Sequence, residues 1–253
     1  MMGGREEGRV VARVDRYSVK IEVWGGASPL TTVRVGACSA VMGGEVWVLG
    51  GRGEEGVLAS VEVYRNALFT LEEGGEEMES MAPMSEGREG AGCVSYCDRL
   101  YIFGGRGEGG AVLASAEVYS GGTWCALAPM VVPREGFRVA VAEDRVMVVG
   151  GRRGEQLLER VDVFCLLSHT WVEGADQLPA PRADFALVAV ATCALLPATL
   201  DRLGCREDSV VVRAGRVATP LGEYWAEVAA AHEVVRGVVE EVEGRELARD
   251  GEG

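Results

Sequence analysis

The stretch that decides the fold is residues 100–106, which read Leu-Tyr-Ile-Phe-Gly-Gly-Arg: an apolar run, two glycines and an arginine. The pattern also occurs at residues 46–52 as Val-Trp-Val-Leu-Gly-Gly-Arg and at residues 146–152 as Val-Met-Val-Val-Gly-Gly-Arg. It recurs after 54 residues and again after 46, and its glycine pairs are Gly50-Gly51, Gly104-Gly105 and Gly150-Gly151. A pattern that recurs at a nearly fixed interval is the signature of a repeat protein.

Three further landmarks keep the same order within each repeat. An alternating segment follows each glycine pair, and these segments end at Tyr64, Tyr119 and Phe164. A large aromatic residue comes next, at Phe69, Trp124 and Trp171. An arginine stands before each apolar first strand, at Arg34, Arg88, Arg134 and Arg182. Alternation with period two predicts β-strands, so each repeat is expected to form four short strands.

These landmarks resemble the kelch repeat, whose period is about 50 residues. The resemblance covers roughly residues 11–216 and implies an all-β fold, a β-propeller of four-stranded blades of which about four to five are recognisable. Three copies are clear, residues 11–24 look like the last two strands of another blade, and residues 207–216 look like a decayed copy. We therefore expect a propeller domain over residues 11–220. Either C-terminal strands complete the N-terminal half blade and close a small ring, or the propeller is incomplete or divergent.

Residues 221–253 follow a different pattern. Apolar residues between Tyr224 and Val242 recur at intervals of three and four, which predicts an amphipathic helix. The last residues, 250–253, are expected to form a disordered tail.

The composition disfavours several classes of partner. The formal net charge is −14, so long-range repulsion disfavours nucleic acid. The sequence has no run of about 18 apolar residues, so we expect no membrane span. The cysteines number seven, and the first residues are rich in glycine and charge, unlike a signal peptide. Both features favour a cytoplasmic location with reduced thiols.

Catalytic chemistry has little support in the sequence. Its two histidines, His169 and His232, lie far apart, and it contains no Cys/His cluster, nucleophile elbow or phosphate loop. We expect no catalytic residue, no metal and no cofactor. One acidic residue recurs at the same third-strand position of each repeat, which indicates a structural role; these are Glu62, Glu117 and Asp162. A propeller enzyme that acts on a sugar or small molecule is the alternative, and it predicts converging polar side chains and a metal or an acid at the channel.

Two sets of arginines are the candidate partner-binding residues. The first set follows the glycine pairs and comprises Arg52, Arg106 and Arg152; the second comprises Arg34, Arg88, Arg134 and Arg182. The resemblance implies that both sets lie on one face near the channel, where the planar guanidinium fork could hold an acidic peptide. The alternative is that these arginines bond neighbouring turns and carbonyl groups from blade to blade.

The resemblance implies a protein-interaction module that recognises a protein or acidic peptide through loops on one face, as a scaffold would. A second family role is that of substrate adaptor in a ubiquitin ligase. It would need another chain here, because no BTB domain can be placed before the repeats. Actin binding is a further family role. The irregular pattern after Arg182 leaves open a further alternative, in which the protein is a decayed copy of a kelch propeller that folds poorly.

Overall fold

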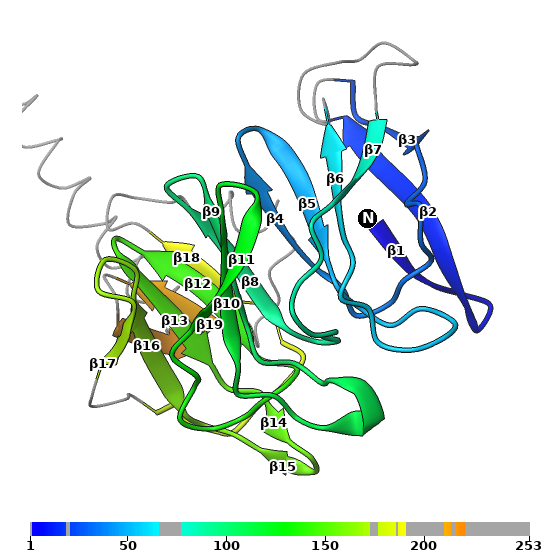
Figure 1. Ribbon diagram of the computed structural model, residues 1–253. Helices are drawn as coiled ribbons and strands as arrows, with labels where there is room; N and C mark the ends of the chain where they lie inside the picture. The colour runs from blue at the N-terminus through cyan, green and yellow to red at the C-terminus, as the bar shows by residue number, and fades with distance from the viewer. Residues whose placement is uncertain are drawn as a thin grey trace, which may run out of the picture. The chain divides into compact units, whose positions relative to one another are not determined.

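The computed structural model describes residues 2–18, 21–65, 77–172, 177–185, 187–190, 210–213 and 216–220, and their regular structure is almost entirely β-strand (Figure 1). The chain divides into two compact units, residues 1–184 and residues 185–253. One short 3-10 turn, Glu108–Gly110, is the single helical element in these described ranges. No helix among them is long and apolar enough to cross a bilayer.

Three four-stranded antiparallel sheets form most of the first unit, and the strands of each sheet follow chain order (Figure 1). Blade 2 contains β4 (Cys38–Met42), β5 (Glu45–Leu49), β6 (Val61–Arg65) and β7 (Glu77–Met81). Blade 3 contains β8 (Gly92–Tyr96), β9 (Arg99–Phe103), β10 (Ala116–Ser120) and β11 (Thr123–Leu127). Blade 4 contains β12 (Arg138–Ala142), β13 (Arg145–Val149), β16 (Val161–Cys165) and β17 (Thr170–Val172). A small hairpin of β14 (Arg152–Arg153) and β15 (Gln156–Leu157) connects β13 to β16.

The glycine pairs end the second strand of each blade, as predicted. The second glycine of each pair has a φ of +96°, +99° or +96°, at Gly51, Gly105 and Gly151. A Cβ at Gly105 would lie 2.9 Å from the carbonyl oxygen of Glu89 in the same blade. The amide of Gly105 donates to the carbonyl oxygen of Arg134, which precedes the next blade, at 2.9 Å. Both the positive φ and the close approach of the chain therefore require glycine here.

The core lies between neighbouring blades, and we call each contact between two blades a seam. Trp47 and Leu49 of blade 2 pack with Leu100 and Ile102 of blade 3. The seam between blades 3 and 4 is built around Tyr101, Phe103, Phe137, Val148 and Phe164. The aromatic landmarks lie in these seams: the ring centroids of Tyr119 and Trp124 are 5.2 Å apart, and those of Phe164 and Trp171 are 5.1 Å apart.

Blade 1 has three strands, β1 (Met2–Glu6), β2 (Arg9–Ser18) and β3 (Val23–Ala27). It begins before residue 11, where the repeat was expected to start, because Gly3-Gly4-Arg5 is another copy of the Gly-Gly-Arg pattern. The amide of Gly4 donates to the carbonyl oxygen of Arg34 at 2.9 Å, and Gly51 makes the same contact with Arg88 at 2.7 Å. Sequence reasoning missed this copy because the apolar run that marks the others is not present before Gly3.

The second unit contains one described sheet, formed by β18 (Leu187–Val190), β19 (Val210–Arg213) and β20 (Arg216–Pro220). β18 and β19 pair in parallel, whereas the first two strands of blades 2, 3 and 4 pair antiparallel. This sheet therefore departs from the pattern expected of a decayed copy at residues 207–216. The landmark Phe69 and the helix and tail expected over residues 221–253 lie outside the described residues.

Candidate functional site

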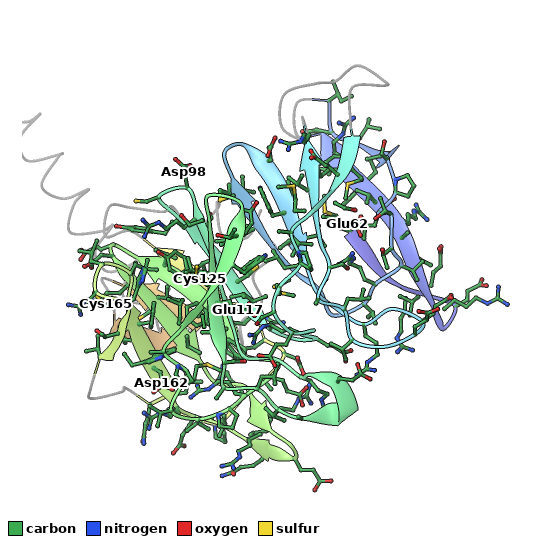
Figure 2. The ribbon with its side chains drawn as sticks, in the orientation of Figure 1. Glu62, Asp98, Glu117, Cys125, Asp162 and Cys165 are labelled. Carbon is green, nitrogen blue, oxygen red and sulfur yellow. The ribbon has the colours of Figure 1, made fainter. Side chains whose placement is uncertain are left out.

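The arginines that precede the first strands are buried inside the blades. The side chains of Arg34, Arg88 and Arg134 have no exposed surface. Each guanidinium bonds a carboxylate on the third strand of its own blade, in the pairs Arg34–Glu62, Arg88–Glu117 and Arg134–Asp162. Figure 2 labels these three carboxylates, one in each of blades 2, 3 and 4.

The Arg88 group shows how a buried charge is satisfied here. Its Nη1 donates to the carbonyl oxygens of Gly104 at 3.0 Å and Ser115 at 3.1 Å, and its Nη2 donates to Glu117 at 2.8 Å. Glu117 also accepts the backbone N–H of Ser85 at 2.9 Å. Within the described part of the chain, Nε is the one nitrogen of this guanidinium without a partner. Buried ion pairs are tolerated when further hydrogen bonds of this kind offset their desolvation.

This burial bears on both roles predicted for Arg34, Arg88 and Arg134. Their side chains have no exposed surface with which to contact a partner, and they bond carbonyl groups and a carboxylate of their own blade rather than of the next one. Burial lowers the pKa of Arg134, and the charge of Asp162 opposes that shift. Arg182 is half-buried, and its carbonyl oxygen accepts the amide of Gly151 at 2.8 Å.

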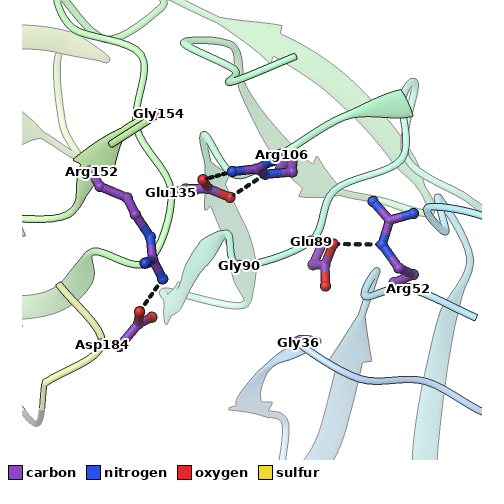
Figure 3. Close-up of a pocket in the computed structure, with 10 residues that line it drawn as sticks. Gly36, Arg52, Glu89, Gly90, Arg106, Glu135, Arg152, Gly154 and Asp184 are labelled. Atoms are coloured by element: carbon purple, nitrogen blue, oxygen red, sulfur yellow. Dashed lines mark hydrogen bonds and ion pairs between the residues drawn. The ribbon is translucent and has the colours of Figure 1, made fainter. Parts of the chain in front are cut away.

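The arginines that follow the glycine pairs lie at the seams and bond acidic residues across them. Figure 3 shows the three ion pairs, Arg52–Glu89, Arg106–Glu135 and Arg152–Asp184. Nε of Arg52 donates to Glu89 at 2.8 Å. Arg106 holds Glu135 with both Nε, at 2.6 Å, and Nη2. These contacts support the blade-to-blade alternative for the first set, but they leave the arginines partly exposed.

The three ion pairs line a hollow of about 490 Å³ in the first unit. One residue from each successive repeat also lines it, namely Gly36, Gly90, Gly136 and Asp184. A series of backbone hydrogen bonds joins these residues: the amide of Gly90 donates to Gly36 at 2.8 Å, that of Gly136 to Gly90 at 3.1 Å, and that of Asp184 to Gly136 at 2.8 Å. The φ values of Gly36, Gly90 and Gly136 lie between +62° and +65°, and that of Asp184 is +54°. In each repeat, one residue with a left-handed backbone conformation thus keeps the chain close to the hollow.

The arginines of the hollow retain hydrogen-bond donors for a ligand. Their side chains are 36%, 37% and 40% exposed, for Arg52, Arg106 and Arg152. Counting bonds among the described residues only, Arg52 donates through Nε alone and Arg152 through Nη2 alone, and Nη1 of Arg106 is unused. The hydrogen bonds and charge of Glu135 raise the pKa of Arg106. The hollow therefore offers cationic N–H donors within an alternating series of positive and negative groups.

Sequence reasoning missed the acidic partners of these arginines. A signal for two of them was available, because Glu89 and Glu135 directly follow the buried Arg88 and Arg134. Asp184 stands one position later, after Arg182 and Ala183. Arg52, Arg106 and Arg152 therefore line a pocket in which acidic side chains balance their charge.

The described ranges contain no cluster of three or more His, Cys, Asp or Glu side chains that could hold a metal ion. His169 is half-buried, and its Nε2 lies 3.3 Å from the hydroxyl of Tyr101. Its ring stacks on Phe164 with the centroids 6.2 Å apart. These contacts place His169 in the packing between blades 3 and 4.

Comparison with known proteins agrees with this architecture. The kelch motif matches residues 87–131 and 133–177, which correspond to blades 3 and 4. Kelch-like protein 36 of Bos taurus is 26% identical over 210 residues, and the match covers 79% of this chain and 33% of that protein. Beta-scruin of Limulus polyphemus is 26% identical over 154 residues, covering 57% of this chain and 17% of that protein. The chain thus spans a third or less of the length of these relatives.

A solved structure titled "Structure of YjhT" shares the fold, with a TM-score of 0.55 at 14% identity over 66% of this chain and 52% of that one. Four-stranded blades, each with a second strand that ends in a glycine pair, define a repeat protein of the β-propeller class. The chain carries two kelch motifs, in blades 3 and 4, and is similar to kelch-like proteins over most of its length.

Proposed function

We propose that this protein is an interaction module that binds a carboxylate-bearing segment of another protein in the pocket lined by Arg52, Arg106 and Arg152. The observation that carries the proposal is the set of unused N–H donors on partly exposed guanidinium groups beside a hollow of about 490 Å³. Guanidinium groups bind carboxylates through charge-assisted and often bidentate hydrogen bonds. The kelch-like relatives support a role in protein interaction in general terms.

The charge balance of the pocket favours a short acidic segment over an extended polyanion. Glu89, Glu135 and Asp184 hold the guanidinium groups in place, and they repel carboxylates that approach outside the free donors. The net charge of −14 adds repulsion at long range, which disfavours nucleic acid. A ligand with one or two carboxylates that reach neighbouring arginines suits this arrangement.

A peptide selection tests this proposal directly. Peptides selected from a random displayed library on the full chain are expected to contain Asp or Glu, and replacing those residues by Asn or Gln should abolish binding. The triple variant Arg52→Gln, Arg106→Gln, Arg152→Gln should weaken binding at least about tenfold, since a hydrogen bond to a charged group contributes about 1.5–3 kcal/mol. Fluorescence anisotropy measures both effects.

Arg145→Gln is the matched control for the triple variant. Arg145 is the first residue of β13, at the opposite end of that strand from the glycine pair, and its side chain is 52% exposed. This variant should bind as the wild type does. If selected peptides bind the triple variant as tightly as the wild type, the pocket is not the docking site.

Two more specific roles are part of the same proposal. A scaffold or a ubiquitin-ligase substrate adaptor would use this pocket to hold its partner, and an intracellular location fits that role. A propeller enzyme is the competing function, because polar side chains do converge in the pocket. Each pocket carboxylate is already bonded by an arginine, however, an arrangement that positions the arginines and favours binding over acid–base chemistry.

A further inference from the structure

Two cysteines from neighbouring blades face each other across the seam between blades 2 and 3. Cys38 is the first residue of β4 and Cys93 is the second residue of β8, and these are the first strands of their blades. Successive side chains of a strand point to opposite faces. The first position of one blade can therefore meet the second position of the next, and β4 packs beside β8.

The seam between blades 3 and 4 shows the same geometry with different residues. There the first position is Gly92 in β8 and the second position is Val139 in β12. A Cβ at Gly92 would lie 2.7 Å from Cγ1 of Val139, so these two positions are in direct contact. The equivalent positions of the preceding seam carry two sulfur atoms.

The surroundings of the two thiols agree with this placement. Sγ of Cys38 donates to the carbonyl oxygen of Leu49 at 3.8 Å, at the end of β5. Interaction with the Cys38 thiol, followed by burial, raises the pKa of Cys93 well above its usual value. Both residues are partly buried and pack against the cluster around Trp47.

We propose that Cys38 and Cys93 are a modification site at which a hydroperoxide forms a reversible disulfide bond between blades 2 and 3. The Cys38 thiolate attacks one oxygen of the hydroperoxide, the O–O bond breaks, and a sulfenic acid and an alcohol form. Cys93 then gives up its proton and attacks the Cys38 sulfur, and the S–O bond breaks to release water. The two thiols lose two electrons, and the hydroperoxide accepts them.

The disulfide would strengthen a seam that also carries the Arg52–Glu89 ion pair. A crosslink between sequence-distant residues restricts the unfolded chain, so oxidation should raise Tm by at least about 4 °C. The reaction needs thiolate from both residues, and Cys93 holds its proton strongly. We therefore expect the bond to form faster as the pH rises.

The test treats the purified full chain with hydrogen peroxide and maps its peptides without reduction by mass spectrometry. The expected product is one peptide pair joined through Cys38 and Cys93, lighter by two hydrogen atoms and separated again by dithiothreitol. The rise in Tm should appear and disappear with this crosslink. Links that involve only other cysteines, or sulfinic acid at Cys38 and Cys93 without a link, would overturn the proposal.

Serine variants of the cysteines provide a second test beside the peptide map of the wild type. Cys38→Ser and Cys93→Ser should each remove the crosslinked peptide and the rise in Tm. Cys125→Ser is the matched control, because Cys125 lies exposed on β11, and this variant should form the crosslink as the wild type does. Should a serine variant fail to fold, the wild-type peptide map still gives the answer.

Discussion

An arginine of this repeat is buried or partly exposed according to its place in the blade. Arg88, before the first strand, is enclosed with Glu117, whereas Arg106, after the second strand, stays 37% exposed at the pocket. The recurrence of both positions was readable from the sequence, and so was the structural role of the carboxylate at Glu117. Their exposure was not, because it depends on how the loops of one blade pack against the next.

Removing one member of a buried pair should be strongly destabilising. Arg88→Met leaves the Glu117 carboxylate buried without its counter-charge, which is expected to lower the free energy of unfolding by about 3–5 kcal/mol. The double variant Arg88→Met, Glu117→Leu should recover much of that loss, because it removes both charges. Urea unfolding followed by circular dichroism measures both values.

Arg145→Met serves as the surface control for these variants. Its side chain is about half exposed, so the free energy of unfolding should change by no more than about 0.5 kcal/mol. A double variant as unstable as Arg88→Met alone would show that Arg88 stabilises the blade by packing and backbone bonds rather than by pairing with Glu117.

At the scale of the element, period-two alternation predicted the first three strands of blades 2, 3 and 4 well. The fourth strand of blade 2, β7, lies at Glu77–Met81, after the aromatic landmark that was expected to mark it. The third strand alternates because its carboxylate, Glu62 or Glu117, pairs with a buried arginine, and the second strand is marked by the glycine pair at its end. Blade 1 was only partly recognised, since Gly3-Gly4-Arg5 carries no preceding apolar run. The parallel pairing of β18 and β19 had no local signal, because pairing direction depends on contacts between distant segments.

The second glycine of each pair should be far less replaceable than a turn glycine with a similar backbone. Gly122→Ala, in the β10–β11 turn, places a Cβ in open space at a φ of +89° and should cost about 1–3 kcal/mol from backbone strain. Gly105→Ala, at a φ of +99°, also brings the Cβ to 2.9 Å from the carbonyl oxygen of Glu89. Overpacking should add about 1–3 kcal/mol to that strain.

Chemical unfolding of the two glycine variants side by side separates strain from crowding. The difference between them reports the close approach of the backbone, since the two φ values are nearly equal. Equal losses of stability would mean that backbone strain alone requires glycine at the end of the second strand.

At the scale of the whole molecule, the ion pairs within blades and those between successive segments differ in burial. The buried pairs lie within blades, whereas Arg52, Arg106 and Arg152 bridge successive segments at partly exposed positions. Partly exposed ion pairs contribute only about 0–1 kcal/mol each. We therefore expect that the pocket arginines can bind a partner without being needed for folding.

The triple variant Arg52→Gln, Arg106→Gln, Arg152→Gln should remain folded. Its free energy of unfolding should fall by less than about 3 kcal/mol, which follows from three partly exposed pairs. Circular dichroism and urea unfolding provide the measurement. A variant that is unfolded in buffer would contradict this and would show that the pocket pairs hold the blades together.

The same two backbone hydrogen bonds join one repeat to the next. In the first, a glycine amide donates to an arginine carbonyl oxygen, as Gly105 does to Arg134. In the second, a residue with a left-handed backbone donates to the equivalent residue of the preceding repeat, as Gly136 does to Gly90. Contacts limited to nearest neighbours make the stability of an array a sum of unit and junction terms. If the chain is stretched in a force spectrometer, each junction can then fail while its neighbours hold. The extension should grow in increments of one repeat, 54 or 46 residues long, so that mechanical load is released blade by blade.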